Sequence, residues 1–280
     1  MQVSFNGRVV LVTGGSRGIG RAVVELFAAG GARLVVQFRA DQQAADDTVA
    51  ALLGGGHLAV QADIADPEQV RSLIERVIEV FGRIDVLVNN AGIYQEHPIL
   101  ATSYEDWQRI WRQTIQTNLI GPANLLHAVA PHMVAAGGGR IVNISSRGAF
   151  RGEPDHPAYG ASKAGLNSLG QSMAQALGRH GIYVATVAPG FVETDMAAPF
   201  LQGAAGDAIR AQSPLNRAAT AQEVARVVVF LATLGAESRT APSWTSTARP
   251  TCGRNASEPA KQRTAVVSVS QSRPRRNPSW

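Results

Sequence analysis

The sequence predicts one α/β domain, a doubly wound parallel sheet flanked by helices, followed by an irregular C-terminal tail. Through residue 234, short runs of β-branched and aliphatic residues alternate with amphipathic segments of helical length. The strand-like runs are apolar throughout, which is typical of parallel strands covered on both faces. A glycine-rich loop separates the first run from the first helix. In such folds, ligands bind at the carboxyl ends of the strands.

The elements follow one another in regular alternation. The expected strands are 9–13, 34–38, 58–61, 86–89, 141–144 and 183–187. The expected helices are 18–29, 41–53, 67–81, 104–135, 157–179 and 221–234. Asp66 followed by Pro67 is an N-cap with proline at the first helical position, and three glycines at 137–139 end the long helix.

The basic charge of the chain is concentrated in its last part. Residues 1–237 contain 18 basic and 20 acidic side chains, a net charge of −2. Residues 238–280 contain eight basic side chains and one acidic side chain, a net charge of +7. The overall charge of +5 therefore belongs to the tail, and we expect no nucleic-acid partner.

Composition also argues against several other classes of protein. No run of about 18 apolar residues is present, so we expect no membrane span. The first residues lead directly into a strand, so we expect no secretory segment there. The single cysteine, Cys252, forms no internal disulfide framework and fits a cytoplasmic location. The six histidines lack metal-ligand spacing, so we expect no metal site.

Lys163 is the only lysine among the first 237 residues, which contain seventeen arginines. It follows Tyr159 by four residues, and residues i and i+4 share a face of a helix. Arginine is a rigid fork that stays protonated, whereas lysine is a compact, tunable ammonium. We therefore expect Lys163 to lower the Tyr159 pKa from about 10 and make the phenol a general acid or base. The alternative is an ordinary helical tyrosine beside a solvated lysine.

The loop between the first strand and the first helix reads TGGSRGIG from Thr13 to Gly20. Glycine permits positive φ and close approach of a ligand to the backbone. The helix N-terminus presents free N–H groups and a positive dipole end to a pyrophosphate. The loop therefore predicts a nucleotide site, although its GxxxGxG spacing differs from GxGxxG and the same glycines could serve only a turn.

Further motifs follow this loop in a fixed order. They are NNAG at 89–92, Asn118, SS at 145–146, YGASK at 159–163 and PGFVET at 189–194. Together with the glycine loop, this set resembles the short-chain dehydrogenase/reductase family, in particular its 3-oxoacyl-(acyl-carrier-protein) reductase type, over about residues 5–234. The resemblance implies a Rossmann-type fold and a nicotinamide cofactor.

The resemblance implies a catalytic role for four residues. Tyr159 would exchange a proton with the substrate oxygen, and Lys163 would lower the Tyr159 pKa and hold the nicotinamide ribose. Asn118 would hold a water molecule in a proton relay to Lys163. Ser146 would hydrogen bond to the substrate oxygen, and it is preferred to Ser145 because it lies thirteen residues before Tyr159.

The resemblance also implies a set of cofactor contacts. The phosphate end would be held by Gly14, Ser16, Arg17, Gly18, Ile19 and Gly20. The adenosine side would meet Asp63, Ile64, Asn89, Ala91 and Gly92. The nicotinamide end would meet Tyr159, Lys163, Pro189, Gly190, Val192 and Thr194.

The end of the second strand indicates which nicotinamide cofactor binds. An NAD enzyme of this fold usually places a carboxylate there to accept a hydrogen bond from the ribose 2′-hydroxyl. Here Phe38 is followed by Arg39, and Arg17 lies in the glycine loop. Two guanidinium groups can bind a 2′-phosphate, so the sequence favours NADP(H) over NAD(H). Asp41 is the competing carboxylate, since it could reach back from the next helix.

The tail departs from the family pattern. After Leu234 the family supplies a seventh strand, whereas residues 238–280 are rich in Ser, Thr, Pro and Arg and are predicted to be disordered and outside the sheet. Read in a shifted frame from the last base of the Pro242 codon, permitted codons can spell VLDVNGASYLR, which resembles the missing strand. We therefore expect a frameshift near residues 238–241 in the coding sequence; the alternative is a natural divergent extension.

These features together predict a cytoplasmic, NADP(H)-dependent reductase of a small-molecule carbonyl, or oxidase of the corresponding alcohol, assembled as a homotetramer or homodimer. A 3-oxoacyl thioester, a small ketone, a sugar or a steroid would all fit. Segments 147–156 and 196–214 are expected to select the substrate. The rival interpretation is a non-catalytic nucleotide-binding protein of the same fold, impaired by the altered C-terminus; an epimerase or dehydratase of the extended relatives fits the loop spacing poorly.

Overall fold

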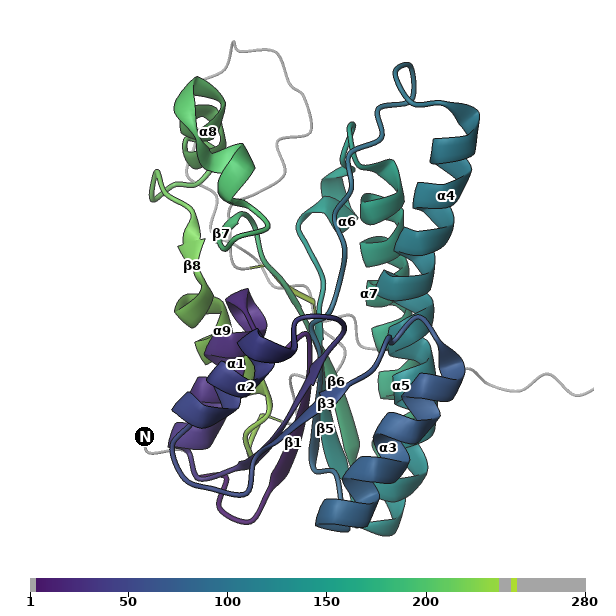
Figure 1. Cartoon of the computed structure of the whole chain (residues 1–280), viewed down its shortest axis with the longest axis vertical. Coiled ribbons are helices and arrows are strands. Elements are labelled where there is room, and N and C mark those ends of the chain that lie inside the picture. Colours follow the sequence, from purple (N-terminus) through teal and green to yellow (C-terminus); the bar gives the residue numbers. More distant parts are fainter. Residues whose placement is uncertain (1–3, 237–242, 246–280) are drawn as a thin grey trace, which may run out of the picture. The chain divides into compact units, whose positions relative to one another are not determined.

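The central layer of the protein is one parallel sheet, seen in a computed structural model that describes residues 4–236 and 243–245. Within these residues the strand order is β3-β2-β1-β4-β5-β6-β9, and helices cover both faces (Figure 1). From β1 the chain continues to β2 and β3 on one side of β1, and it then returns to form β4 on the other side of β1. This reversal between β1 and β4 is the topological switch point at which such folds bind ligands. The predicted doubly wound α/β fold is confirmed.

Apart from Ser243–Thr245, the strands of this sheet agree closely with the predicted ranges. They are β1 (Val9–Thr13), β2 (Arg33–Phe38), β3 (Leu58–Gln61), β4 (Val86–Asn89), β5 (Gly139–Ile144), β6 (Ile182–Ala188) and β9 (Ser243–Thr245). A separate short pair consists of β7 (Val192–Glu193) and β8 (Ala219–Thr220).

Helices form a layer on each face of the sheet (Figure 1). One layer contains α1 (Gly18–Ala29), α2 (Gln42–Ala51) and α9 (Ala221–Leu231). The other contains α3 (Pro67–Phe81), α4 (Tyr104–Ile115), α5 (Gly121–Ala135) and α7 (Pro157–Leu177). Each layer closes a hydrophobic core that includes fully buried side chains such as Phe27 and Leu73, each of which stabilises the fold by about 1.5–3 kcal/mol. Within the described ranges, no helix has both the length and the apolar character needed to cross a bilayer.

The sequence signals at two helix ends are present in the structure. The Asp66 carboxylate accepts hydrogen bonds from the N–H groups of Glu68 and Gln69, at 2.9 and 3.3 Å, and Pro67 begins α3 as predicted. At the start of α9, the Thr220 hydroxyl accepts from the Glu223 N–H at 3.2 Å, and Glu223 accepts from the Thr220 N–H at 2.8 Å. These caps satisfy N–H groups that the helices leave unpaired.

The helix predicted over 104–135 is interrupted. A five-residue π-helical turn, Gln116–Ile120, separates α4 from α5. It contains Asn118, whose side chain is fully buried. A π turn inserts an extra residue into the helix and often marks a functional position. The periodicity of the sequence contains no signal for this turn, so the prediction of one continuous helix over 104–135 is wrong at this point.

The tail contributes one element that the sequence prediction excluded. Ser243–Thr245 forms β9 and pairs in parallel with β6, with Thr186 opposite Ser243 and Ala188 opposite Thr245. The prediction that residues 238–280 lie outside the sheet is therefore wrong for these three. Backbone pairing depends little on side-chain character, and it satisfies N–H and C=O groups on the open edge of β6. In the shifted frame these positions read Val-Leu-Asp; residues 237–242 and 246–280 lie outside the described residues.

The segment between β7 and β8 lies beyond the carboxyl ends of the strands. It contains a 3₁₀ turn, Ala198–Leu201, and α8 (Gly203–Arg210), which stands above the sheet in Figure 1. Pairing of Val192 with Ala219 and of Glu193 with Thr220 brings the two ends of this segment together. The segment therefore begins and ends beside the ligand-binding edge of the sheet.

Candidate active site

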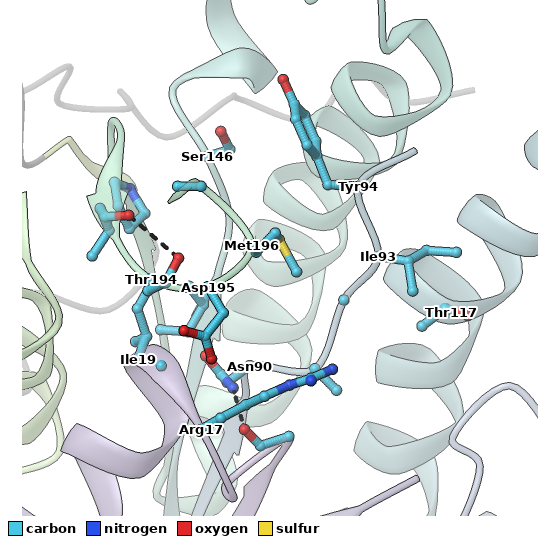
Figure 2. Close-up of a pocket in the computed structure, with 18 of the residues that line it drawn as sticks. Arg17, Ile19, Asn90, Ile93, Tyr94, Thr117, Ser146, Thr194, Asp195 and Met196 are labelled. Atoms are coloured by element: carbon cyan, nitrogen blue, oxygen red, sulfur yellow. Dashed lines mark hydrogen bonds between the residues drawn. The ribbon is translucent and has the colours of Figure 1, made fainter. Parts of the chain in front are cut away.

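A cavity of about 650 Å³ lies where the carboxyl ends of β1, β4, β5 and β6 meet the segment that follows β7 (Figure 2). All the predicted site residues line it except Gly20, Asn89 and Asn118. In Figure 2, Ser146 and Tyr94 lie at one end of the cavity, and Arg17 and Asn90 lie at the other. The motifs that follow four different strands thus meet in one elongated site.

The glycine loop fits closely against the start of α1. Gly14 and Gly18 have φ values of 60° and 53°, in the left-handed region that glycine tolerates best. A Cβ on Gly20 would overlap the Gly14 carbonyl oxygen and lie 2.6 Å from the Asn90 amide nitrogen. That amide donates hydrogen bonds to the carbonyl oxygens of Thr13 and Gly14, at 2.9 and 3.0 Å. Gly20 thus shapes the loop from behind rather than lining the cavity.

The two asparagines of the NNAG motif have different surroundings. Asn89 is buried, and its amide donates to the Asn143 side chain on β5 at 2.9 Å. The prediction that Asn89 lines the cofactor side does not match this position, because the side chain points into the sheet layer. The neighbouring Asn90 lines the cavity instead. Ala91 and Gly92 line it as predicted.

Two arginines at the end of β2 and in the glycine loop lack acidic partners. Arg17 and Arg39 are exposed and line the cavity, and neither forms an ion pair within residues 4–236 and 243–245. Asp41, the competing carboxylate, caps α2 by accepting from the Ala44 N–H at 3.0 Å. The capping bond engages one carboxylate oxygen of Asp41, which also lines the cavity, and the two guanidinium groups form no ion pair with it.

Tyr159 and Lys163 lie one turn apart on α7 and both reach the cavity. The Lys163 side chain is almost fully buried, and its ammonium donates to the Ile144 carbonyl oxygen at 2.8 Å. The Lys163 nitrogen lies 5.7 Å from the centre of the Tyr159 ring. A Cβ on Gly92 would approach this nitrogen to 3.5 Å, so glycine leaves room above the ammonium.

The pKa values of this pair differ from the sequence prediction. Burial raises the Tyr159 pKa to about 12, and a hydrogen bond with Ser146 only partly offsets it. Burial also lowers the Lys163 pKa to about 8. The prediction that Lys163 lowers the Tyr159 pKa below its usual value is therefore wrong for this structure. The physical reason is that removing both groups from water disfavours both charged forms, and the ammonium is directed at Ile144.

The two serines after β5 have separate partners. The Ser145 hydroxyl is buried and donates to the Lys163 carbonyl oxygen at 3.2 Å. Ser146 lines the cavity, and its hydroxyl accepts from the Gly148 N–H at 3.1 Å and interacts with the Tyr159 phenol. Ser145 therefore fastens α7 to β5, whereas Ser146 is placed to meet a ligand beside Tyr159.

Asn118 lies behind the cavity wall in the π turn. Its carbonyl oxygen accepts from the Ile93 N–H at 2.8 Å, and its amide donates to the Ile93 carbonyl at 3.0 Å. The amide also contacts the Ser162 hydroxyl at 3.2 Å. Asn118 thus links the loop after β4 to α7 at Ser162, the residue directly before Lys163.

An aromatic cluster that the sequence does not predict lies beside Tyr159. Tyr94 stacks on His156 with ring centres 3.7 Å apart and meets Tyr159 edge-on at 4.7 Å. Phe200, from the segment after β7, packs edge-on against Tyr94 at 5.5 Å. Three segments far apart in sequence form this cluster, so no local pattern could reveal it. The ranges 147–156 and 196–214, expected to select substrate, do contribute cavity-lining residues.

Metal-ligating side chains are not gathered in this site. Over the described part of the chain, no three or more His, Cys, Asp or Glu side chains group closely enough to hold a metal ion. The cavity is lined by the Tyr159 phenol, the Lys163 ammonium, the Ser146 hydroxyl and the guanidinium groups of Arg17, Arg39 and Arg147.

Comparison with known proteins places the chain in a family. Residues 8–204 match the family model of the short chain dehydrogenases. The chain is 40% identical, over 82% of its own length and 91% of the relative, to a 3-oxoacyl-(acyl-carrier-protein) reductase of Synechocystis sp.. It is 37% identical, with the same coverage, to the reductase of that name from Escherichia coli.

A solved structure also relates the chain to the short chain dehydrogenases. The fold is similar to that of a short chain dehydrogenase from Burkholderia cenocepacia in complex with NADP, with a TM-score of 0.78 and 36% identity over 86% of this chain and 96% of that one. Family model, relatives and structure agree with the motifs brought together at the cavity. The chain belongs to the short-chain dehydrogenase/reductase family.

Proposed function

We propose that this protein is an NADP(H)-dependent oxidoreductase that reduces a carbonyl group to a secondary alcohol, with a 3-oxoacyl compound as the substrate class. The main support is that Tyr159, Lys163 and Ser146 line one cavity together with the glycine loop. The substrate class is supported by relatives from Synechocystis and Escherichia coli, which bear the name of 3-oxoacyl reductases.

The cavity fits a dinucleotide phosphate. Gly14 and Gly18 line the cavity beside the start of α1 without side chains, and the helix N-terminus favours an anion there. Arg17 and Arg39, which lack acidic partners in the part of the chain that the structure describes, would bind a 2′-phosphate. When bound, NADPH supplies a hydride to the carbonyl carbon and becomes NADP⁺.

The residues of the chain supply the proton and the orientation. A phenol whose pKa is raised to about 12 remains protonated at neutral pH, so Tyr159 can donate its proton to the carbonyl oxygen as that oxygen gains negative charge. The carbonyl π bond breaks, the carbon gains the hydride, the oxygen gains the Tyr159 proton, and solvent protonates the tyrosinate again. Ser146 would hydrogen bond to the same oxygen, and Lys163 would hold the nicotinamide ribose.

Two further proposals concern the protein as a whole. We propose a homo-oligomer, a tetramer or a dimer, and a cytoplasmic location. Leu100, in the turn before α4, and Tyr104, the first residue of α4, have largely exposed side chains, which supports a subunit contact on that surface. Light scattering of the full chain tests the oligomer: a purely monomeric protein would contradict it.

A substrate panel tests the proposed reaction. The full chain is supplied with NADPH and, separately, with a 3-oxoacyl thioester, a simple ketone, a ketose and a steroid ketone, while oxidation of the cofactor is followed by its absorbance. Among these four compounds, we expect the 3-oxoacyl thioester to give the highest kcat/KM, with the alcohol as product. Absence of turnover with every compound, at saturating NADPH, would overturn the proposal.

A further inference from the structure

We propose that the substrate carries an anionic group, most simply a carboxylate near the reacting carbonyl, and that Arg147 binds it. This inference rests on the proposed carbonyl reduction and narrows its substrate class. It comes from the position, the surroundings and the charge of Arg147, none of which the nicotinamide cofactor requires.

Arg147 is fixed beside the reacting groups. It directly follows Ser146, and its N–H donates to the Pro189 carbonyl oxygen at 2.9 Å. Its side chain lines the same cavity as Tyr94 and Tyr159. The carbon of its guanidinium lies 4.9 Å from the centre of the Phe191 ring. Stacking on an aromatic ring holds the plane of a guanidinium and leaves its N–H edges for a ligand.

The positive charge of Arg147 has no acidic partner of its own. Within the described residues it forms no ion pair, and its Nη2 atom is buried without a hydrogen-bond partner. The neighbouring Arg151 lies 3.7 Å from the Glu153 carboxylate and donates to the Gln212 side chain at 3.0 Å. This wall of the cavity therefore contains two guanidinium groups and one carboxylate, an excess of one positive charge.

Such an excess is unfavourable unless a ligand compensates for it. Removing a charge from water without a partner is costly, and the pKa of Arg147 is lowered first by burial and then by the nearby Arg151. A carboxylate matches a guanidinium edge with two parallel hydrogen bonds. A neutral thioester or ester could not compensate for the charge. The geometry therefore favours an anionic oxo compound over a neutral one.

A matched pair of substrates tests this assignment. We compare kcat/KM for 3-oxobutanoate and its ethyl ester, with saturating NADPH, in the wild type, Arg147→Gln and Arg151→Gln. A hydrogen bond to a charged group corresponds to a change of about 10- to 100-fold. We expect Arg147→Gln to lower kcat/KM for the anion by that factor and to change the value for the ester less than about threefold. Arg151→Gln removes a charge that is already paired with Glu153 and is the control. It should leave the ratio of kcat/KM values for the anion and the ester unchanged.

Binding without turnover keeps this inference separate from the proposed reaction. The alcohol 3-hydroxybutanoate is titrated calorimetrically into the NADPH-loaded protein, where no hydride can be transferred, beside its ethyl ester. We expect tighter binding of the anion in the wild type and loss of that advantage in Arg147→Gln. Absence of turnover together with Arg147-dependent binding would overturn the proposed reaction alone. If Arg147→Gln still preferred the anion over the ester, or if Arg151→Gln lost that preference to the same extent, the proposed role of Arg147 would be overturned. Arg147 would then only stack on Phe191.

Discussion

Replacing Gly20 by alanine tests how the phosphate loop is built. Gly20 lies in the first turn of α1, and the added methyl group would overlap the Gly14 carbonyl oxygen and lie 2.6 Å from the Asn90 amide nitrogen. Both neighbours are held in place, since the Asn90 amide donates to the carbonyls of Thr13 and Gly14. The methyl group can be accommodated only if the loop moves away from α1.

The size of the effect follows from three contributions. Overpacking a tight contact costs about 1–3 kcal/mol. Loss of the two Asn90 hydrogen bonds costs about 1 kcal/mol each. Alanine in place of glycine within a helix returns about 1 kcal/mol. We therefore expect Gly20→Ala to lower the free energy of unfolding by about 2–4 kcal/mol, a fall in Tm of about 4–16 °C for a chain of this size.

Thermal unfolding with and without NADPH measures both the loss of stability and the loss of cofactor binding in Gly20→Ala. The displaced loop should also weaken NADPH binding, so the cofactor should raise the Tm of Gly20→Ala less than that of the wild type. Gly178→Ala is the matched control, because a Cβ there meets nothing within 4 Å and the φ of −55° suits any residue. Equal Tm values for the two variants, with equal stabilisation by NADPH, would refute the reasoning.

Four further perturbations have expected outcomes. Tyr159→Phe should lower kcat at least about 100-fold with little change in NADPH affinity, and near-normal kcat would contradict the proton-donor role. Lys163→Arg should also lose most activity, because the planar guanidinium is too large for the buried site in which the ammonium donates to a backbone carbonyl. Near-normal kcat in steady-state kinetics would contradict this expectation. Arg39→Asp should shift the ratio of kcat/KM values from NADPH toward NADH, and an unchanged ratio would exclude Arg39 from phosphate binding. Burial lowers the His156 pKa to about 4, below its usual 6.5, so the free energy of unfolding should fall as pH decreases from about 6.5 toward 4, and a His156→Gln variant unfolded in urea should lose this dependence.

The layered fold could be predicted because its signals are local. Apolar runs of strand length, the Asp66 cap and the glycine loop each depend on a few neighbouring residues, and the observed elements begin and end within a few residues of the expected ones. The proximity of Tyr159 and Lys163 follows in the same way from helical spacing. The proximity of side chains that share one helix face, or that follow the ends of adjacent strands, can be predicted from sequence alone.

The remaining features depend on packing that no local pattern records. The Tyr94 cluster needs three distant segments, and the choice between Asn89 and Asn90 depends on which way one residue faces at a strand end. The Tyr159 pKa differs in direction from the prediction because burial raises it and outweighs the hydrogen bond with Ser146, and burial depends on the tertiary fold. Pairing of β9 with β6 was missed because backbone hydrogen bonds, not an apolar side-chain pattern, define that strand.

Transfer of deuterium from NADPH labelled at C4 of the nicotinamide tests the central claim most directly. The full chain is incubated with labelled NADPH and, in parallel reactions, with 3-oxobutanoate and with its ethyl ester. The alcohol is analysed by mass spectrometry, with NADPH deuterated on each face of the ring used in turn. We predict that one of the two labels appears as a single deuterium on the carbinol carbon and that Tyr159→Phe abolishes most of its formation. An absence of alcohol, or an alcohol unlabelled from both cofactors, would contradict hydride transfer by this protein.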